Sequence, residues 1–182
     1  MKKHYLLILS IFTVFAITSC SSDDDSGSNS NGSNASSDSY LEIEGDSYQL
    51  RSGVIEDYGE GSNETFNFDI TLISASVTSI NGEFIPEGDS YTGIYFELWS
   101  DNSSDLAEGT YSYSNSEDGF TYTYSEIHKD ISTDTFTGEY IDITSGELEV
   151  NKNGNNYEFT FTGTTFDGDD ISMYYSGSLV EY

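Results

Sequence analysis

The sequence predicts an all-β domain over residues 40–182, in the form of a single antiparallel β-sandwich, with an irregular β-barrel as the alternative. Two observations support this prediction. Apolar and polar residues alternate with a period of two in several segments, and Asn-Gly and Asp-Gly pairs that favour tight turns lie between those segments. No comparable helical stretch is found past residue 40.

Segment 65–72 (TFNFDITL) is the clearest predicted strand, because its apolar residues all fall on one face. Segments 147–150, 157–162 and 171–179 are joined by short polar loops, so they predict a closing antiparallel meander. With shorter candidates included, we expect about nine or more strands. The alternation recurs in three apolar trios, which are Ile94, Phe96 and Leu98; Phe120, Tyr122 and Tyr124; and Tyr157, Phe159 and Phe161.

Residues 1–19 are typical of a secretory signal peptide. Lys2 and Lys3 precede an uncharged, largely apolar run over residues 5–17, which is short for a membrane span. The run ends in Ile17-Thr18-Ser19-Cys20, which resembles the lipobox of bacterial lipoproteins. That resemblance implies cleavage before Cys20 and acylation of its sulfur and amine. Two acyl chains suffice for stable anchoring, so the lipid bilayer is the first expected partner.

Residues 20–39 form the predicted tether, a Ser-, Asn- and Asp-rich stretch that buries too little apolar surface to fold. Its first residues after the cysteine resemble the export signal of Bacteroidota-type surface lipoproteins; they are Ser21, Ser22, Asp23, Asp24 and Asp25. The resemblance implies an outer-membrane lipoprotein displayed at the cell surface. The β-rich region, with its closing segment 174–179, is similar to small β-rich lipoproteins of the same bacterial group.

Charge excludes one class of partner. The chain has 33 acidic and 5 basic residues, a formal net charge of −28 at pH 7. Past the leader, the fixed cations are Arg51, Lys129 and Lys152. Nucleic acid binding needs clustered Lys and Arg, so the sequence excludes it. The chain has one Cys, so the domain has no disulfide and depends on a hydrophobic core.

Enzyme motifs are scarce. His128 is the one histidine past the leader, and it stands in a polar stretch (SEIHKD) without a nucleophile-elbow motif, so we expect an exposed loop residue. A zinc site built from His and Cys is excluded by the same composition. The abundant acids leave a glycoside hydrolase with two carboxylates as an alternative function.

Two acidic loops suggest calcium as a metal ligand, because Ca²⁺ binds several hard oxygens. The first has Asp167, Asp169 and Asp170 around a glycine at a predicted hairpin tip. The second loop offers Asp101, Asn102, Asp105 and Glu108. Neither loop completes the EF-hand pattern, and Asp and Asn also favour turns for backbone reasons. A calcium-dependent adhesion module is a further alternative function.

Aromatic residues suggest a glycan-binding surface. The chain has 15 Tyr, 11 Phe and 1 Trp. If Ile94, Phe96 and Leu98 face the core, the opposite face presents Tyr95, Glu97 and Trp99 as a flat platform with a carboxylate. Packing of Trp99 in the core is the competing interpretation. The sequence therefore predicts a non-enzymatic binding or structural domain, with a glycan, surface polymer or surface protein as its ligand.

Overall fold

The computed structural model describes residues 35–80 and 83–181. The predicted leader, Cys20 and the acidic cluster at 21–25 lie outside these residues. The described part of the chain forms thirteen β-strands and no helix, which confirms the all-β prediction. Accordingly, nothing in these two ranges forms a helix long and apolar enough to cross a membrane.

The strand bounds overlap the predicted segments 65–72, 157–162 and 171–179, whereas the strands at 52–60 and 83–86 were not predicted. In chain order the strands are β1 (Tyr40–Ile43), β2 (Asp46–Gln49), β3 (Ser52–Glu60), β4 (Phe66–Ile73), β5 (Val77–Ile80), β6 (Glu83–Pro86), β7 (Ser90–Ser100), β8 (Gly109–Tyr113), β9 (Thr121–Ser132), β10 (Glu139–Asn153), β11 (Asn156–Thr165), β12 (Asp170–Gly177) and β13 (Val180–Glu181).

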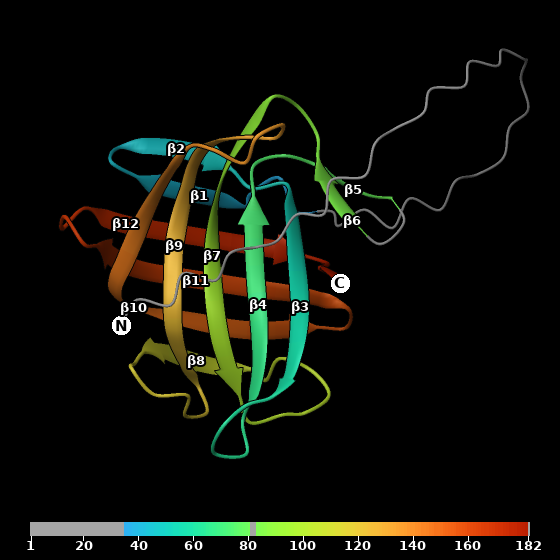
Figure 1. Ribbon diagram of the computed structural model, residues 1–182, viewed down its shortest axis with the longest axis vertical. Helices are drawn as coiled ribbons and strands as arrows, with labels where there is room; N and C mark the ends of the chain where they lie inside the picture. Colours follow the sequence, from blue (N-terminus) through green and yellow to red (C-terminus); the bar gives the residue numbers. More distant parts are fainter. Residues whose placement is uncertain (1–34, 81–82, 182) are drawn as a thin grey trace, which may run out of the picture.

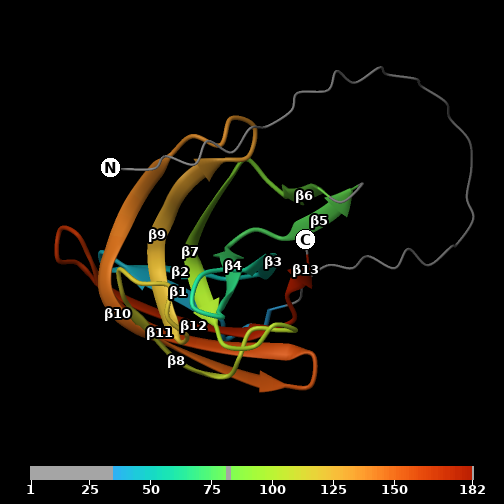
Figure 2. The same cartoon turned by 60° about the horizontal axis from the view of Figure 1, so that its bottom comes forward.

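Eleven strands form one continuous sheet in the order β13-β3-β4-β7-β9-β8-β10-β11-β12-β1-β2, and β5 pairs with β6 in a separate hairpin. In Figure 1, β3, β4, β7 and β9 stand side by side, while β11 and β12 cross behind them. Figure 2 shows the sheet curling between these two halves like a half-barrel. Face-to-face packing of the kind predicted for a sandwich therefore arises within a single curled sheet. The predicted meander is confirmed, since β10, β11 and β12 pair antiparallel in succession.

The corner of the sheet lies in β10. The first part of this strand pairs with β9 and its later part with β8, while β11 follows it along most of its length. Its register with β11 shifts between Ile143 and Ser145, and just beyond this bulge Gly146 pairs with Gly163. A Cβ on Gly163 would lie 2.3 Å from the Ser145 carbonyl oxygen, so only glycine fits there. Paired glycines therefore let the two strands bend closely together.

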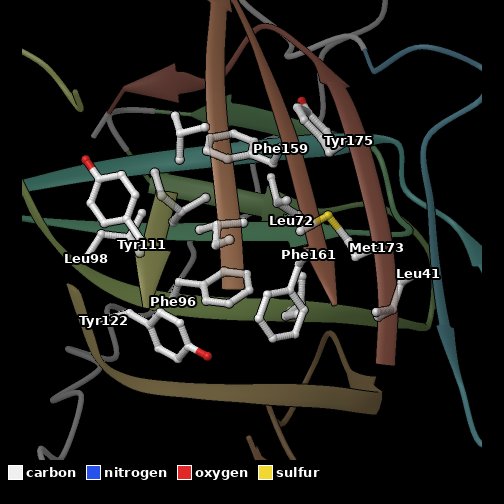
Figure 3. Packing of buried hydrophobic residues seen from close by; sticks show 14 of the residues in the cluster. Leu41, Leu72, Phe96, Leu98, Tyr111, Tyr122, Phe159, Phe161, Met173 and Tyr175 are labelled. Atoms are coloured by element: carbon white, nitrogen blue, oxygen red, sulfur yellow. The ribbon is translucent and has the colours of Figure 1, made fainter. Parts of the chain in front are cut away.

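The core fills the concave side of the curl. Strand β7 contributes Ile94, Phe96 and Leu98, each with no exposed surface, from the front half of the sheet. They face aromatic residues of the back half, and the ring of Phe96 meets Phe161 edge-on with 5.1 Å between centroids (Figure 3). The predicted alternation in β4, β7 and β11 is thus confirmed, and the face of β7 opposite to the core is turned outward.

Strand β9 departs from the predicted alternation. Tyr122 is fully buried, as expected, but Tyr124 is 43% exposed, and Phe120 lies before the strand with a φ of 61°. The cause is a bulge: Glu97 pairs with Tyr124 and Leu98 with Tyr122, which leaves Thr123 as the extra residue. The bulge turns both Thr123 and Tyr124 outward. It therefore adds an aromatic ring to the outer face of the sheet.

The domain begins before the predicted boundary at residue 40. The backbone N–H of Ala35 donates to Arg51 O at 3.1 Å, and that of Ser36 donates to Ser176 O at 2.6 Å. Ser39 is buried, and its hydroxyl accepts the Ser176 N–H at 3.0 Å. Residues 35–39, the last five of the predicted tether, therefore form part of the folded unit.

Candidate functional site

The outer face of β3, β4, β7, β9 and the start of β10 gathers tyrosines and carboxylates, and no other layer of the described structure covers it (Figure 1). Three of its rings are well exposed: Tyr58 at 60%, Tyr124 at 43% and Tyr140 at 47%. We call it the tyrosine–carboxylate face. Its residues are Glu56, Tyr58, Asp69, Tyr95, Glu97, Tyr124, Glu126, His128, Tyr140 and Asp142.

Carboxylates stand directly opposite one another across this face. Glu56 on β3 pairs with Asp69 on β4, and Asp69 pairs in turn with Glu97 on β7. A second pair of acids, Glu126 and Asp142, is formed between β9 and β10. Side chains in such positions lie roughly 5 Å apart, and like charges there destabilise the sheet. The fold thus keeps like charges together at an energetic cost.

Hydroxyl groups hold these carboxylates in place. Tyr58 donates to Glu56 Oε2 at 2.6 Å, and Tyr95 donates to Asp69 Oδ2 at 2.5 Å. Thr123, the bulge residue, donates to Glu97. Tyr and Thr hydroxyls are neutral donors, so these bonds fix the orientation of each carboxylate without cancelling its charge.

Asp69 has the most perturbed acidity of the face. Burial raises its pKa to about 7, and the neighbouring charges of Glu97 and Glu56 act in the same direction. The hydrogen bond from Tyr95 opposes this shift only in part. Burial also raises the pKa of the Tyr95 hydroxyl, and the negative charge of Asp69 adds to the rise. Asp69 therefore changes its charge near neutral pH.

His128 lies within the sheet, so the prediction of an exposed loop residue is wrong. It belongs to β9, its side chain is 13% exposed, and its ring stacks on Tyr95 with 6.2 Å between centroids. Tyr140 meets the same ring edge-on at 5.0 Å. Its Nε2 lies 2.8 Å from Glu126 Oε1. The histidine therefore links the tyrosines of β7 and β10 to a carboxylate.

Glu126 is held in its charged form. Burial acts to raise its pKa, but the hydrogen bonds from His128 and Tyr124 outweigh burial and lower the pKa below its usual range. The Tyr124 hydroxyl donates to Glu126 Oε2 at 2.5 Å. Both oxygens of this carboxylate thus have a donor, in contrast to the single hydroxyl that holds Glu56.

Trp99 does not form an exposed platform with Tyr95 and Glu97. All three side chains leave the outer side of β7 as predicted, but Trp99 is only 7% exposed. Its Nε1 donates to Thr123 Oγ1 at 2.8 Å. Gly61 lies so close to the ring that a Cβ there would be 2.2 Å from Trp99 Cζ3. Trp99 therefore packs under the β3–β4 loop, as in the competing interpretation, and the exposed rings are tyrosines.

The loop candidate at 167–170 is explained by turn geometry. Thr165 N donates to Asp169 O at 3.0 Å, and Asp169 N donates to Thr165 Oγ1 at 3.0 Å. Gly168 between them has a φ of 92°, which favours glycine. Asp167 is exposed at the tip, and Asp170 lines a shallow groove with residues of β1 and β2. These contacts close the β11–β12 turn.

The second loop candidate serves to attach the β7–β8 connection to the β10–β11 hairpin. Asp105 accepts hydrogen bonds from Lys152 and Tyr157, and Glu108 Oε1 accepts the Lys152 N–H at 2.8 Å. Burial acts to raise the pKa of Asp105, but the bonds from Lys152 and Tyr157 outweigh it and lower that pKa. Asn102 Oδ1 accepts the Ser104 N–H at 3.0 Å, a local turn contact.

Within residues 35–80 and 83–181, no three His, Cys, Asp or Glu side chains are grouped so that they could hold a metal ion. The calcium hypothesis for Asp167, Asp169, Asp170 and the 101–108 loop therefore has no carboxylate cluster to support it. The best-defined constellation is the tyrosine–carboxylate face, of which the sequence predicted Tyr95 and Glu97 as ligand-binding residues.

Comparison with known proteins adds no relative. A scan against protein-family models, a search of curated proteins and a search of solved structures each found no match to this chain.

Proposed function

We propose that this chain is a lipid-anchored, surface-displayed outer-membrane lipoprotein whose β-domain is a non-enzymatic binding module for a glycan or surface polymer. The leader, Cys20 and the acidic residues 21–25 support the anchor and the display through their resemblance to lipoprotein signals. Residues 35–39 join the folded unit, so a tether of up to 14 residues, 21–34, would separate it from the lipid.

The binding role is supported by one observation above all, the exposure of Tyr58, Tyr124 and Tyr140 on a sheet face that no other layer within residues 35–80 and 83–181 covers. Flat rings stack on the apolar faces of sugars, while neighbouring carboxylates accept sugar hydroxyls. Soluble proteins usually bury large aromatic rings, and tyrosines concentrated on one face mark an interaction surface. Folds of this kind serve many functions, so the half-barrel itself is no evidence for binding, and the proposed role is based on the residues of the tyrosine–carboxylate face.

The anchor is tested by Cys20→Ala. Because the thiol and the amine of Cys20 receive the acyl chains in lipoproteins, this variant is expected to incorporate no labelled palmitate and to leave the membrane fraction. The measurement is metabolic labelling with a tagged fatty acid, followed by fractionation. A wild-type chain that incorporates no label contradicts the anchor.

The binding role is tested by Tyr124→Ala/Tyr140→Ala on an array of immobilised polysaccharides, with the full-length protein in detergent. We expect wild type to be retained on at least one glycan and the double variant to lose at least tenfold in affinity, because the stacking rings are removed. Tyr113→Ala is the matched control: Tyr113 is 40% exposed but lies on β8, where it contacts the core ring of Tyr122.

Three results contradict the binding role as stated. They are a wild-type protein that no glycan retains, a double variant that binds as wild type does, and a Tyr113→Ala variant that loses as much as the double variant. Release of new reducing ends from a retained glycan instead favours the carboxylate-dependent hydrolase. In that case Asp69, whose pKa burial raises to about 7, and Glu97 on the next strand are the pair to replace.

A further inference from the structure

We propose that the tyrosine–carboxylate face binds a glycan that carries free amino groups, so that its ligand is cationic. This inference rests on the proposed function and specifies the chemical class of the ligand. Positive charge is scarce on this face, although the fold places carboxylates directly opposite one another there.

Among the residues that the structure describes, the carboxylates of this face have almost no cationic partner. Of the fixed cations, Lys129 forms its ion pair with Glu44 in the β1–β2 turn, and Lys152 forms its pair with Asp105 in the β7–β8 loop. Arg51 lies just before β3. The basic group that the described structure places on the face is the imidazole of His128, beside Glu126.

The excess of acid on this face does not simply reflect the high acidic content of the whole chain. Directly opposed acids, as in the row of Glu56, Asp69 and Glu97, are unfavourable in a sheet, and exposed acids elsewhere have room to separate. The raised pKa of Asp69, to about 7, reports the burial and negative potential at the centre of the row. A bound cation would relieve that potential, so charge complementarity favours a positively charged ligand.

The geometry of the row suits an ammonium group. Hydroxyl donors orient the carboxylates of Glu56, Asp69 and Glu97 before any ligand binds, which lowers the entropy cost of binding. Tyrosine rings attract cations through their π faces, and Tyr58 and Tyr124 stand beside the row. A sugar amine can therefore contact carboxylate oxygens while the sugar ring stacks on tyrosine.

A basic peptide is a poorer fit for this surface. Extended peptides commonly bind by adding a strand to a free sheet edge, with main-chain hydrogen bonds. Strands β4, β7 and β9, which form the centre of the face, are each paired on both sides. A peptide would therefore lie across side chains without main-chain partners. A glycan needs only rings and acceptors, which the face presents.

The test uses full-length protein in detergent at physiological salt, with a tetramer of glucosamine and its fully N-acetylated counterpart as probes. The two differ in the amine charge and share the sugar backbone. Isothermal titration is expected to show at least tenfold tighter binding of the amine tetramer. Raising the salt concentration should weaken that binding and leave the acetylated tetramer nearly unaffected, because screening acts on charge.

A matched pair of variants separates the face from the overall charge of the protein. Glu97→Gln/Glu126→Gln is expected to lower the affinity for the amine tetramer about tenfold. Glu149→Gln/Glu158→Gln removes the same charge from exposed positions on β10 and β11 and should bind as wild type does. If the first variant fails to fold, loss of amine-tetramer binding in Tyr124→Ala/Tyr140→Ala decides, because that variant keeps the net charge of wild type.

Each outcome has a distinct meaning. Equal binding of the two tetramers, lost in Tyr124→Ala/Tyr140→Ala, overturns the amine requirement and leaves the glycan role standing. Equal weakening by both glutamine variants shows attraction by net charge alone and overturns the inference. Tetralysine that binds as tightly as the amine tetramer overturns the glycan as occupant. No binding of either tetramer overturns the inference, and no retention on the polysaccharide array overturns the proposed function as well.

Discussion

Trp99→Ala is expected to lower the free energy of unfolding by about 3–5 kcal/mol, the range for truncating a buried large aromatic. The ring is 7% exposed, contacts Gly61 and donates a hydrogen bond to Thr123. Its removal leaves a cavity under the β3–β4 loop. The loss is a large part of the roughly 5–15 kcal/mol that stabilises a typical domain, so a urea or thermal melt detects it easily.

Two further variants show which part of Trp99 matters. Trp99→Phe keeps most of the ring but removes the Nε1 donor, and we expect a smaller loss of about 1–2 kcal/mol. Tyr58→Ala replaces a ring that is 60% exposed, so its melt should stay close to that of wild type. A Trp99→Ala melt that overlays wild type would show that the ring is free for ligand and restore the original platform of Tyr95, Glu97 and Trp99.

Asp69→Asn is expected to raise the free energy of unfolding at pH 8. Ionising Asp69 in the folded protein is opposed by burial and by Glu97 and Glu56, which raises its pKa from 3.8 to about 7. This shift corresponds to a cost of up to about 4 kcal/mol when the carboxyl is charged. Asn keeps an oxygen that accepts the Tyr95 hydroxyl and carries no charge, so the variant avoids the cost.

The raised pKa of Asp69 determines how the stability difference between Asp69→Asn and wild type changes with pH. A pKa raised by folding contributes stability that is full below the unfolded value of 3.8 and is lost as the pH rises to about 7. The advantage of Asp69→Asn should therefore grow between these values and stay constant above them. Glu158→Gln, which removes an exposed charge on β11, is the control in parallel urea titrations. An advantage that does not change with pH would contradict the charge repulsion inferred at Asp69.

Local patterns were enough to predict the strands that are buried on one face. Ile94, Phe96 and Leu98 alternate without interruption, so the inward face of β7 followed from the period of two. The closing meander was predicted from another local feature, the short polar loops that join its segments. Such features depend on neighbours in the sequence, which a single chain shows directly.

The outer face was only half predicted, because it depends on which distant strands become neighbours. Tyr95 and Glu97 were identified from the sequence. Asp69 joins them because β4 pairs with β7, and Tyr124 joins them because β7 pairs directly with β9, although β8 separates these two strands in the sequence. The bulge at Thr123 inserts one residue and reverses the side on which Tyr124 emerges. Periodicity alone does not reveal an inserted residue.

His128 illustrates the same limit. Its polar surroundings in the sequence suggested a loop, yet Ile127 beside it faces the core and fixes this stretch as part of β9. The rings that cover the histidine, Tyr95 and Tyr140, come from β7 and β10. The local sequence around His128 has a single apolar residue and suggested a loop, but contacts with the neighbouring strands make it part of the sheet.

The most direct test of the binding face is an NMR titration of full-length protein in detergent, with ring-labelled tyrosine and the glucosamine tetramer. Resonances of Tyr58, Tyr124 and Tyr140 are expected to shift in a saturable way, while that of Tyr113 on β8 stays in place. Shifts centred on Tyr113, or none among the three exposed tyrosines at saturating ligand, would contradict the assignment of the tyrosine–carboxylate face as the binding surface.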